Sequence, residues 1–348
     1  MNRLILVLRD FYPARLDREA FAALPRLAAL ERWLACADIA PARGGWRNWL
    51  WREFALEAPL APDTVQALVT PASVAAAAVP NLPPGKPLWL ATPVHFVAGL
   101  DTVRLHPAGL LELEREAQDR LAADFARVFA GSGYTLHATG RREMLLAGGT
   151  PVEPAGARSD DPARWLGADP REGFPAGAQG APLRRLGAEI EMWLHEHPVN
   201  RLRAARGELA TNALWLWGGG ASAVICALRA APAAGAWAED AYLDGLARVR
   251  GVEVRVPPER WPPTRTALAQ PTERLVVFGA DVAGRAESLR GMENGWIAPT
   301  LLDWQQGRLD TATLLAGERA ITLPRLRRWR RGWRALRRPR PWWEILLR

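Results

Sequence analysis

Hydrophobic and polar positions change period along the chain, and this predicts strands and helices in turn. Residues Leu4–Leu8 form a short apolar run, which is typical of a buried strand. Leucines at 24, 27, 30 and 34 recur at helical spacing and predict the buried face of a helix over Asp17–Ala35. Further expected helices span Trp46–Glu57, Asp63–Val79, Leu183–Leu194 and Asp240–Val249.

The middle of the chain predicts another helix, a hairpin and a loop. His106-Pro107 is expected to open the helix, and strands at Tyr134–Ala138 and Glu143–Ala147 form the hairpin. The stretch Gly148–Pro182 lacks periodicity and predicts a long loop. The other expected strands are Leu88–Phe96, Asn212–Trp217, Val252–Val256, Arg274–Phe278 and a hairpin over Ala312–Leu323. Alternating strands and helices favour an α/β layered architecture.

Positive charge is concentrated at the C-terminus. The 348-residue chain has a net charge of +8, yet Pro324–Arg348 alone holds ten arginines against one acid, Glu344, so the rest carries −1. Arginines interleaved with tryptophans at helical spacing can bind an anionic membrane surface or nucleic acid. The alternative is a helix docked on the body through its tryptophans. The candidate interaction residues are Arg327, Trp329, Arg330 and Trp333.

The sequence also excludes several classes of protein. No apolar run is long enough to predict a transmembrane segment, and the N-terminal run is too short for a signal peptide. Cys36 and Cys226 lack paired spacing, which argues against a disulfide framework or a cysteine metal site. We therefore expect a cytoplasmic protein.

The most distinctive segment runs from His195 to Gly220. It reads His-Glu-His-Pro-Val-Asn-Arg-Leu-Arg over 195–203 and Thr-Asn-Ala-Leu-Trp-Leu-Trp-Gly-Gly-Gly over 211–220. This resembles the signature of the archaeal-type cofactor-independent phosphoglycerate mutases, which belong to the alkaline phosphatase superfamily. Arg141-Arg142 in the expected hairpin and the later Asp160-Asp161-Pro162 fit the same pattern. The chain resembles a divergent proteobacterial branch of regulatory or mutase-like proteins in this family.

The resemblance implies an α/β, alkaline-phosphatase-like layered core, here eroded, with a smaller mixed α/β insert. We expect residues 1–104 and 221–323 to form the core, 105–220 the mutase-like substrate-side segment, and 324–348 the basic tail. It also implies a pocket for a small phosphorylated or carboxylated metabolite, which guanidinium and amide groups suit. The positions carried over are Arg142, Asn200, Arg203, Asn212, Gly218 and Gly220. The alternative is that the two asparagines cap local backbone and the glycines form a turn.

The catalytic centre of that family is not matched. A mutase of this kind needs two divalent metals, Mn or Mg, and a serine nucleophile. The family pattern has a glycine directly after the aspartate that follows the first strand, and a serine nearby. Asp10 follows the first strand here, but it has neither neighbour. Asp281 stands where an Asp-His pair is expected, yet all five histidines precede residue 198. Asp10 and Asp281 are therefore relic metal candidates, and no catalytic residue is assigned. A structural role is favoured for His195 and His197, which lack a third ligand.

Three functions remain in competition. The first is a catalytically degenerate mutase-like protein without a cofactor, which binds a small phosphorylated or carboxylated ligand in a regulatory role. The second is an active isomerase (phosphoglycerate mutase) or phosphatase that uses Mn or Mg in a rearranged site. The third is an interaction protein that binds nucleic acid or an anionic membrane through its basic tail.

Overall fold

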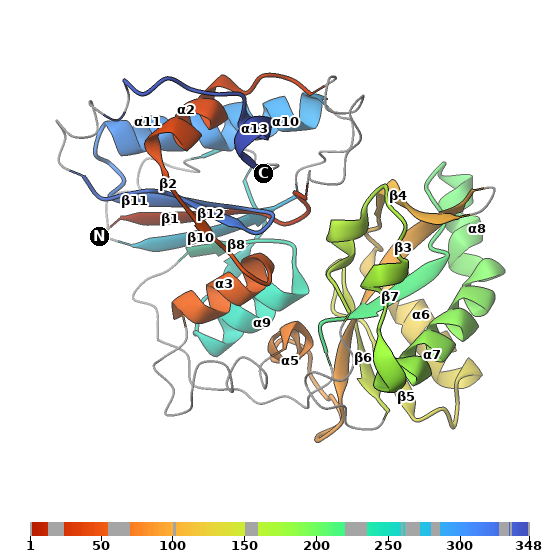
Figure 1. The fold of residues 1–348 in the computed structure, drawn as a ribbon. Coiled ribbons are helices and arrows are strands. Elements are labelled where there is room, and N and C mark those ends of the chain that lie inside the picture. The colour runs from red at the N-terminus through yellow and green to blue at the C-terminus, as the bar shows by residue number, and fades with distance from the viewer. Residues whose placement is uncertain are drawn as a thin grey trace. The chain divides into compact units, whose positions relative to one another are not determined.

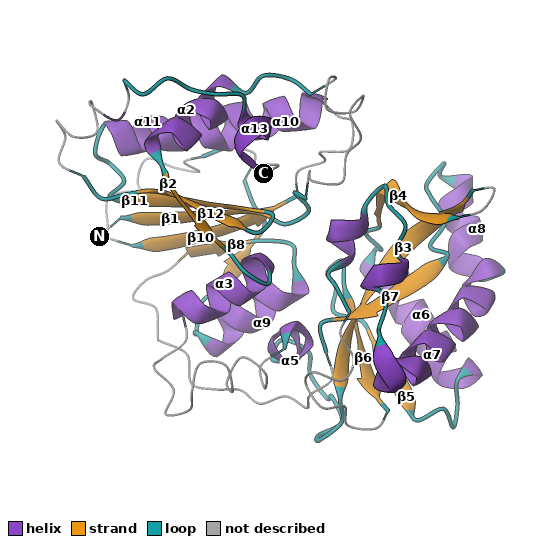
Figure 2. Ribbon diagram, viewed as in Figure 1, coloured by secondary structure: helices purple, strands orange, loops and turns teal. Residues whose placement is uncertain are grey.

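The chain forms two compact units (Figure 1). The structure, a computed structural model, describes residues 2–12, 24–54, 70–99, 102–149, 159–219, 235–258, 260–261, 272–279, 286–326, 334 and 336–346. The first unit comprises Met1–Phe54, Ala230–Glu239 and Gly251–Arg348, and the second comprises Ala55–Arg229 and Asp240–Arg250. Residues 55–104, which the sequence analysis assigned to the core, therefore belong with the second unit. The predicted α/β class is confirmed, with a seven-stranded mixed sheet and a five-stranded antiparallel sheet (Figure 2).

The first unit is built on the seven-stranded sheet, whose order is β2-β12-β11-β1-β10-β8-β9. The strands are β1 (Arg3–Leu8), β2 (Asp38–Pro41), β8 (Gly235–Trp237), β9 (Val254–Arg255), β10 (Glu273–Phe278), β11 (Thr311–Ala316) and β12 (Arg319–Leu323). β1 lies between β10 and β11 and is parallel to both, while β12 and β2 continue the sheet in antiparallel pairing. The apolar run that predicted β1 is explained by its burial, because strands covered on both faces need no polar alternation.

Helices cover both faces of this sheet (Figure 1). One face carries α2 (Ala28–Cys36), α10 (Ala286–Met292), the π-helical turn η5 (Glu293–Ile297), α11 (Ala298–Gln305) and α13 (Trp342–Leu346), and the other carries α3 (Gly45–Phe54). Leu4, Leu6 and Leu8 of β1 pack in one apolar cluster with tryptophans from the first group of helices. The core of this unit therefore depends on large aromatic side chains.

The helix expected over Asp17–Ala35 does not run through Leu24. Its described part starts at Ala28, and Leu24 lies outside it in non-helical backbone. Pro25 supplies the reason, because a proline disfavours helical backbone at the preceding residue. The expected segment before Leu24 lies outside the described residues.

The second unit is a three-layer arrangement around the five-stranded sheet. Its strands are β3 (Leu88–Ala98), β4 (Val103–Leu110), β5 (Tyr134–His137), β6 (Met144–Gly148) and β7 (Ala213–Trp217). Alternate residues serve the two faces: Trp89, Leu146 and Leu216 join one core cluster, while Leu90 and Trp215 join the other. The first cluster is covered by α6 (Arg115–Val128), α7 (Gly177–His195) and α8 (Pro198–Ala205). The second holds residues of α5 (Pro71–Ala76), the 3-10 turn η2 (Pro162–Trp165) and α9 (Ala241–Val249).

The helix expected to open at His106-Pro107 was predicted wrongly at its start. Those residues lie in β4, which pairs with β3, and the helix α6 begins only at Arg115. β4 is the last strand of its sheet path, and β3 has a register shift opposite it. A proline is tolerated at such a place because an edge strand beside a bulge does not need every N–H for pairing.

The long loop expected over Gly148–Pro182 is shorter than predicted. Residues 159–176 contain η2 and a second 3-10 turn, η3 (Arg171–Gly173), and α7 already begins at Gly177. Pro182 lies inside α7 near its N-terminal end. Both predicted hairpins and the strands after residue 210 are confirmed within the described residues. In the part of the chain that is described, the search for a membrane-spanning helix finds none.

Candidate functional site

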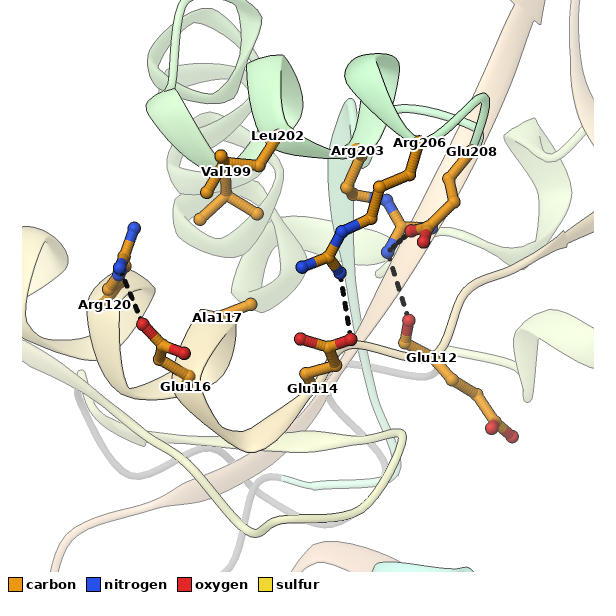
Figure 3. A pocket seen from close by; sticks show the side chains of 10 residues that line it. All are labelled: Glu112, Glu114, Glu116, Ala117, Arg120, Val199, Leu202, Arg203, Arg206 and Glu208. Atoms are coloured by element: carbon orange, nitrogen blue, oxygen red, sulfur yellow. Dashed lines mark hydrogen bonds and ion pairs between the residues drawn. The ribbon is translucent and has the colours of Figure 1, made fainter.

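A pocket of about 510 Å³ opens on the second unit between the start of α6 and the helix α8 (Figure 3). Its lining comes from the turn before α6, from α6, from α8 and from the turn that follows α8. The lining residues are Glu112, Glu114, Glu116, Ala117, Arg120, Val199, Leu202, Arg203, Arg206 and Glu208. Such a volume is in the range that holds a small metabolite.

Each arginine of the pocket is matched with one glutamate. Arg120 contacts Glu116 at 2.6 Å, and Arg206 contacts Glu114 at 2.9 Å. All four of these side chains are more than half exposed to solvent. A third pair, Arg203 with Glu208 at 3.0 Å, is more deeply placed, because the Arg203 side chain is only 12% exposed. The remaining carboxylate, on Glu112, points away from the three pairs (Figure 3).

Arg203 is the one lining residue that the sequence analysis had carried over. Its Nε donates to the carbonyl of Leu209 at 2.7 Å, and its Nη1 donates to the carbonyl of Glu112 at 3.2 Å. Burial lowers the pKa of the Arg203 guanidinium, an effect that Glu208 partly opposes. Arg203 therefore links two backbone segments. Its own positively charged guanidinium lies at the wall of the pocket.

Asn200, the amide of the same motif, is bonded on every side to backbone. Its Nδ2 donates to the carbonyls of Leu194 and Thr211, both at 2.8 Å. Its Oδ1 accepts from the N–H of Thr211 at 2.8 Å. The side chain thus pairs with Thr211 as a neighbouring strand residue does, and it fixes α8 to the start of β7.

Asn212 does the same for the irregular part of β3. Its Oδ1 accepts from the N–H of Phe96 at 2.7 Å, and its Nδ2 donates to the carbonyl of Phe96 at 2.8 Å. β7 begins at Ala213, opposite Val94, so the N–H and C=O of Phe96 have no strand partners on the β7 side. The amide of Asn212 replaces them, because it offers one donor and one acceptor in the geometry of a peptide.

His197 forms the N-cap of α8. Its Nδ1 accepts from the N–H of Val199 at 3.2 Å, and its Nε2 lies 3.2 Å from a carboxylate oxygen of Asp124. These partners fit the neutral tautomer that carries its proton on Nε2. Burial lowers the pKa of His197, and Asp124 opposes that shift. Both ring nitrogens are therefore occupied in holding helices together.

The other expected binding residues lie away from the pocket lining. Arg142 is buried beside Glu143, with its Nη2 at 3.2 Å from the carboxylate. Gly218 has a φ of +61°. Its carbonyl accepts a hydrogen bond from the N–H of Ala72, which lies in the first turn of α5. A positive φ is a backbone conformation that favours glycine. Gly220 lies outside the described residues.

The sequence analysis missed the exposed part of the pocket. Arg120, Arg206, Glu114 and Glu116 line it but carry no sequence signal. A helix with arginines and glutamates at spacings of three and four reads as an ordinary solvated face. Only the approach of α8 to the start of α6 sets these charges around one cavity.

The carboxyl end of β1 is the place where the family pattern puts metal ligands. Asp10 lies there, with its carboxylate 3.4 Å from Nε of the adjacent Arg9. The Arg9 side chain is held by a bond from Nη1 to the carbonyl of Glu239 at 2.7 Å. Of the two metal candidates, Asp10 thus lies beside the guanidinium of Arg9. Asp281, the other candidate, lies outside the described residues.

The described residues do not fit a binuclear metal centre. Among them, no group of three or more His, Cys, Asp or Glu side chains is placed to share a metal ion. Two metal ions need several carboxylate and imidazole ligands around them, and the described residues do not supply such a set.

The basic tail is docked where it is described. Trp342 of α13 is fully buried, lies 5.6 Å from the ring of Phe11, and donates from Nε1 to the carbonyl of Pro25. Arg334 contacts the carboxylate of Asp38 at 2.9 Å. The candidate interaction residues Arg327, Trp329, Arg330 and Trp333 lie outside the described residues, so the partner of the tail stays a prediction.

Comparison with known proteins gives only distant structural neighbours. No family model matches the chain, and no curated protein matches it. Among solved structures, the chain is similar to a cofactor-independent phosphoglycerate mutase from Thermoplasma acidophilum DSM 1728, with 15% identity, a TM-score of 0.35, and coverage of 92% of this chain and 89% of that one. It is also similar to the PH0037 protein from Pyrococcus horikoshii, with 14% identity, a TM-score of 0.40, and coverage of 92% and 86%.

Proposed function

We propose that this protein is a mutase-like, non-catalytic binding protein, which holds a small phosphorylated or carboxylated ligand in the pocket beside α8 and acts in regulation. The observation that carries the proposal is the meeting of three arginines at one cavity. Arg203 comes from the motif that resembles the phosphoglycerate mutases, and Arg120 and Arg206 join it in the lining. Guanidinium groups are the side chains best suited to phosphate and carboxylate.

Two further features of the pocket support an anionic group in it. The helix α6 begins there, and the side chain of its N-cap residue Glu114 makes no capping hydrogen bond. The first N–H groups of a helix and its dipole favour negative charge. Val199 and Leu202 face Ala117 across the cavity and offer apolar contact to the carbon skeleton of a ligand (Figure 3).

The proposal that the protein is not a catalyst rests on how its polar groups are used. The amides of Asn200 and Asn212 and both nitrogens of His197 hold backbone or helix contacts. Asp10 lies beside the guanidinium of Arg9. The family motif is thus explained by the folding of this segment, while the arginines at its edge supply the binding.

Calorimetric titration with 3-phosphoglycerate tests the binding directly. Arg206→Gln is the sharpest variant, because Arg206 is exposed and its removal leaves the backbone contacts intact. We expect it to weaken binding about fivefold, equivalent to ~1 kcal/mol for a solvent-exposed charge pair. Arg203→Gln is less informative, since it also releases two carbonyls.

The matched control is Arg185→Gln. Arg185 is an exposed arginine on α7 that pairs with Glu189 at 3.1 Å and does not line the pocket. It removes the same charge elsewhere and should leave the affinity unchanged. Equal affinity in wild type and in Arg206→Gln, or no measurable heat of binding in the wild type, would show that this pocket is not the site.

A further inference from the structure

The charge pattern of the pocket narrows the class of ligand. Its three arginines are not free cations, because each already contacts a glutamate of the same lining. Figure 3 shows the pairs side by side along the cavity, with Glu116 and Arg120 at one end and Arg203 and Glu208 at the other. The lining therefore presents both signs of charge in close alternation.

A ligand that is only anionic must compete with a glutamate for an arginine or share that arginine with it. If it binds Arg206, the carboxylate of Glu114 is left without that contact and lies close to the negative charge of the ligand. Like charges at such short range oppose binding. The cost is moderate, because the exposed pair contributes little on its own, but it applies to every purely anionic ligand in this pocket.

A ligand that carries an ammonium group beside its anionic groups avoids that cost. Its phosphate or carboxylate contacts Arg206, and its ammonium contacts the carboxylate that Arg206 releases. Glu116 at the neighbouring pair offers a second acceptor of the same kind. Val199 and Leu202 contact the carbon atoms between the two charged ends.

We propose that the ligand of this pocket is zwitterionic, a phosphorylated or carboxylated small molecule that also bears an amino group. The inference rests on the proposed function, since it names the class of ligand for the same pocket. It assigns Glu114 and Glu116 as the residues that distinguish an amine from a hydroxyl.

Two related compounds distinguish a zwitterionic ligand from a purely anionic one. O-phosphoserine and 3-phosphoglycerate share a three-carbon skeleton, a phosphate and a carboxylate, and differ in an ammonium group in place of a hydroxyl. We expect O-phosphoserine to bind roughly two- to fivefold tighter, which is the range for one exposed charge pair. Long-range attraction predicts the reverse order, because the chain carries +8 and 3-phosphoglycerate is the more negative compound.

The variant Glu114→Gln tests the assignment. It should bring the two affinities to about the same value, while Glu189→Gln, an exposed glutamate of α7 outside the lining, should preserve the preference. Thermal unfolding of each variant checks that the fold is kept. A preference that survives both Glu114→Gln and Glu116→Gln overturns the assignment.

The outcomes also separate this inference from the proposed function. Binding of 3-phosphoglycerate that equals or exceeds binding of O-phosphoserine overturns the zwitterionic class and leaves the pocket as an anion site. Binding of neither compound overturns both proposals.

Discussion

Side chains bond to backbone groups in both units of the chain, and prominent examples differ in residue type between the two. In the first unit, three fully buried tryptophans donate from Nε1 to backbone carbonyls: Trp33 to Ile321, Trp304 to Pro324 and Trp342 to Pro25. In the second unit, amide side chains contact backbone N–H and C=O groups together, as Asn200 and Asn212 do.

The difference follows from what each side chain can offer. Tryptophan is a donor only, so it fits a place where one carbonyl lacks a partner and a large apolar volume must be filled. An amide is both donor and acceptor, so it can replace a missing strand residue. Gln118 shows the full case: its Nε2 donates to the carbonyls of Leu113 and Arg141, and its Oε1 accepts from the N–H groups of Thr139 and Gly140. Asn200 and Asn212 thus have a structural role in the second unit.

Removal of a tryptophan from the first unit should have the largest effect on stability. Trp342→Ala deletes a fully buried side chain that packs on Phe11, so we expect a loss of about 3–5 kcal/mol in the free energy of unfolding. Urea denaturation measures it, and hydrogen exchange should place the loss in the first unit. Leu336→Ala is the control, because Leu336 is 77% exposed and should change stability by less than about 0.5 kcal/mol. Equal stability in the two variants would mean that α13 is not docked.

Removal of a motif amide should have a smaller but local effect in the second unit. Asn200→Ala leaves the N–H and C=O of Thr211 and the carbonyl of Leu194 without this partner, which predicts a loss of about 2–4 kcal/mol. Hydrogen exchange should increase around α8 and the start of β7, with protection in the first unit unchanged. A variant as stable as the wild type would contradict the structural role given to the motif.

The pH dependence of stability should also distinguish the units. All five histidines lie in the second unit, and burial lowers the pKa of His106, His137 and His197 below 6.5. A lowered pKa means that the folded state favours the neutral ring. The stabilising contribution is therefore complete above about pH 6.5 and is lost as the pH falls below that value.

Urea midpoints between pH 7.5 and pH 5.5 measure this loss. His197→Asn is the matched variant, because asparagine can still cap α8 but does not titrate. Its stability should fall less on acidification than that of the wild type. The same fall in both proteins would remove His197 from the explanation.

Part of this account could be predicted from the sequence. The β1 strand, both hairpins and the apolar faces of α6 and α7 follow from periodicity, because burial on defined faces leaves a pattern in the residues. The start of α6 could not be predicted, because the residues before it pair with the preceding strand β3 up to Leu110, and that pairing overrides local helix signals. Residue type alone also allowed the alternative that Asn200 and Asn212 bond to backbone groups and not to a ligand.

The pocket was less accessible to prediction. Arg203 was singled out through its motif, but Arg120 and Arg206 are typical of any exposed helix. Their common position depends on how α8 packs beside α6, which no local pattern encodes. The carboxylates that share the lining were missed for the same reason, and with them the mixed charge of the cavity.

The central claim is that this chain binds a small phosphorylated ligand and does not transform it. Phosphorus NMR of 3-phosphoglycerate in the presence of chelator-stripped protein, recorded before and after addition of Mg²⁺, tests both parts at once. The account predicts that the protein shifts or broadens the 3-phosphoglycerate signal and that Arg206→Gln reduces this shift or broadening. No new phosphorus signal should appear over time. A Mg²⁺-dependent signal of 2-phosphoglycerate or free phosphate that disappears in Asp10→Ala would contradict it.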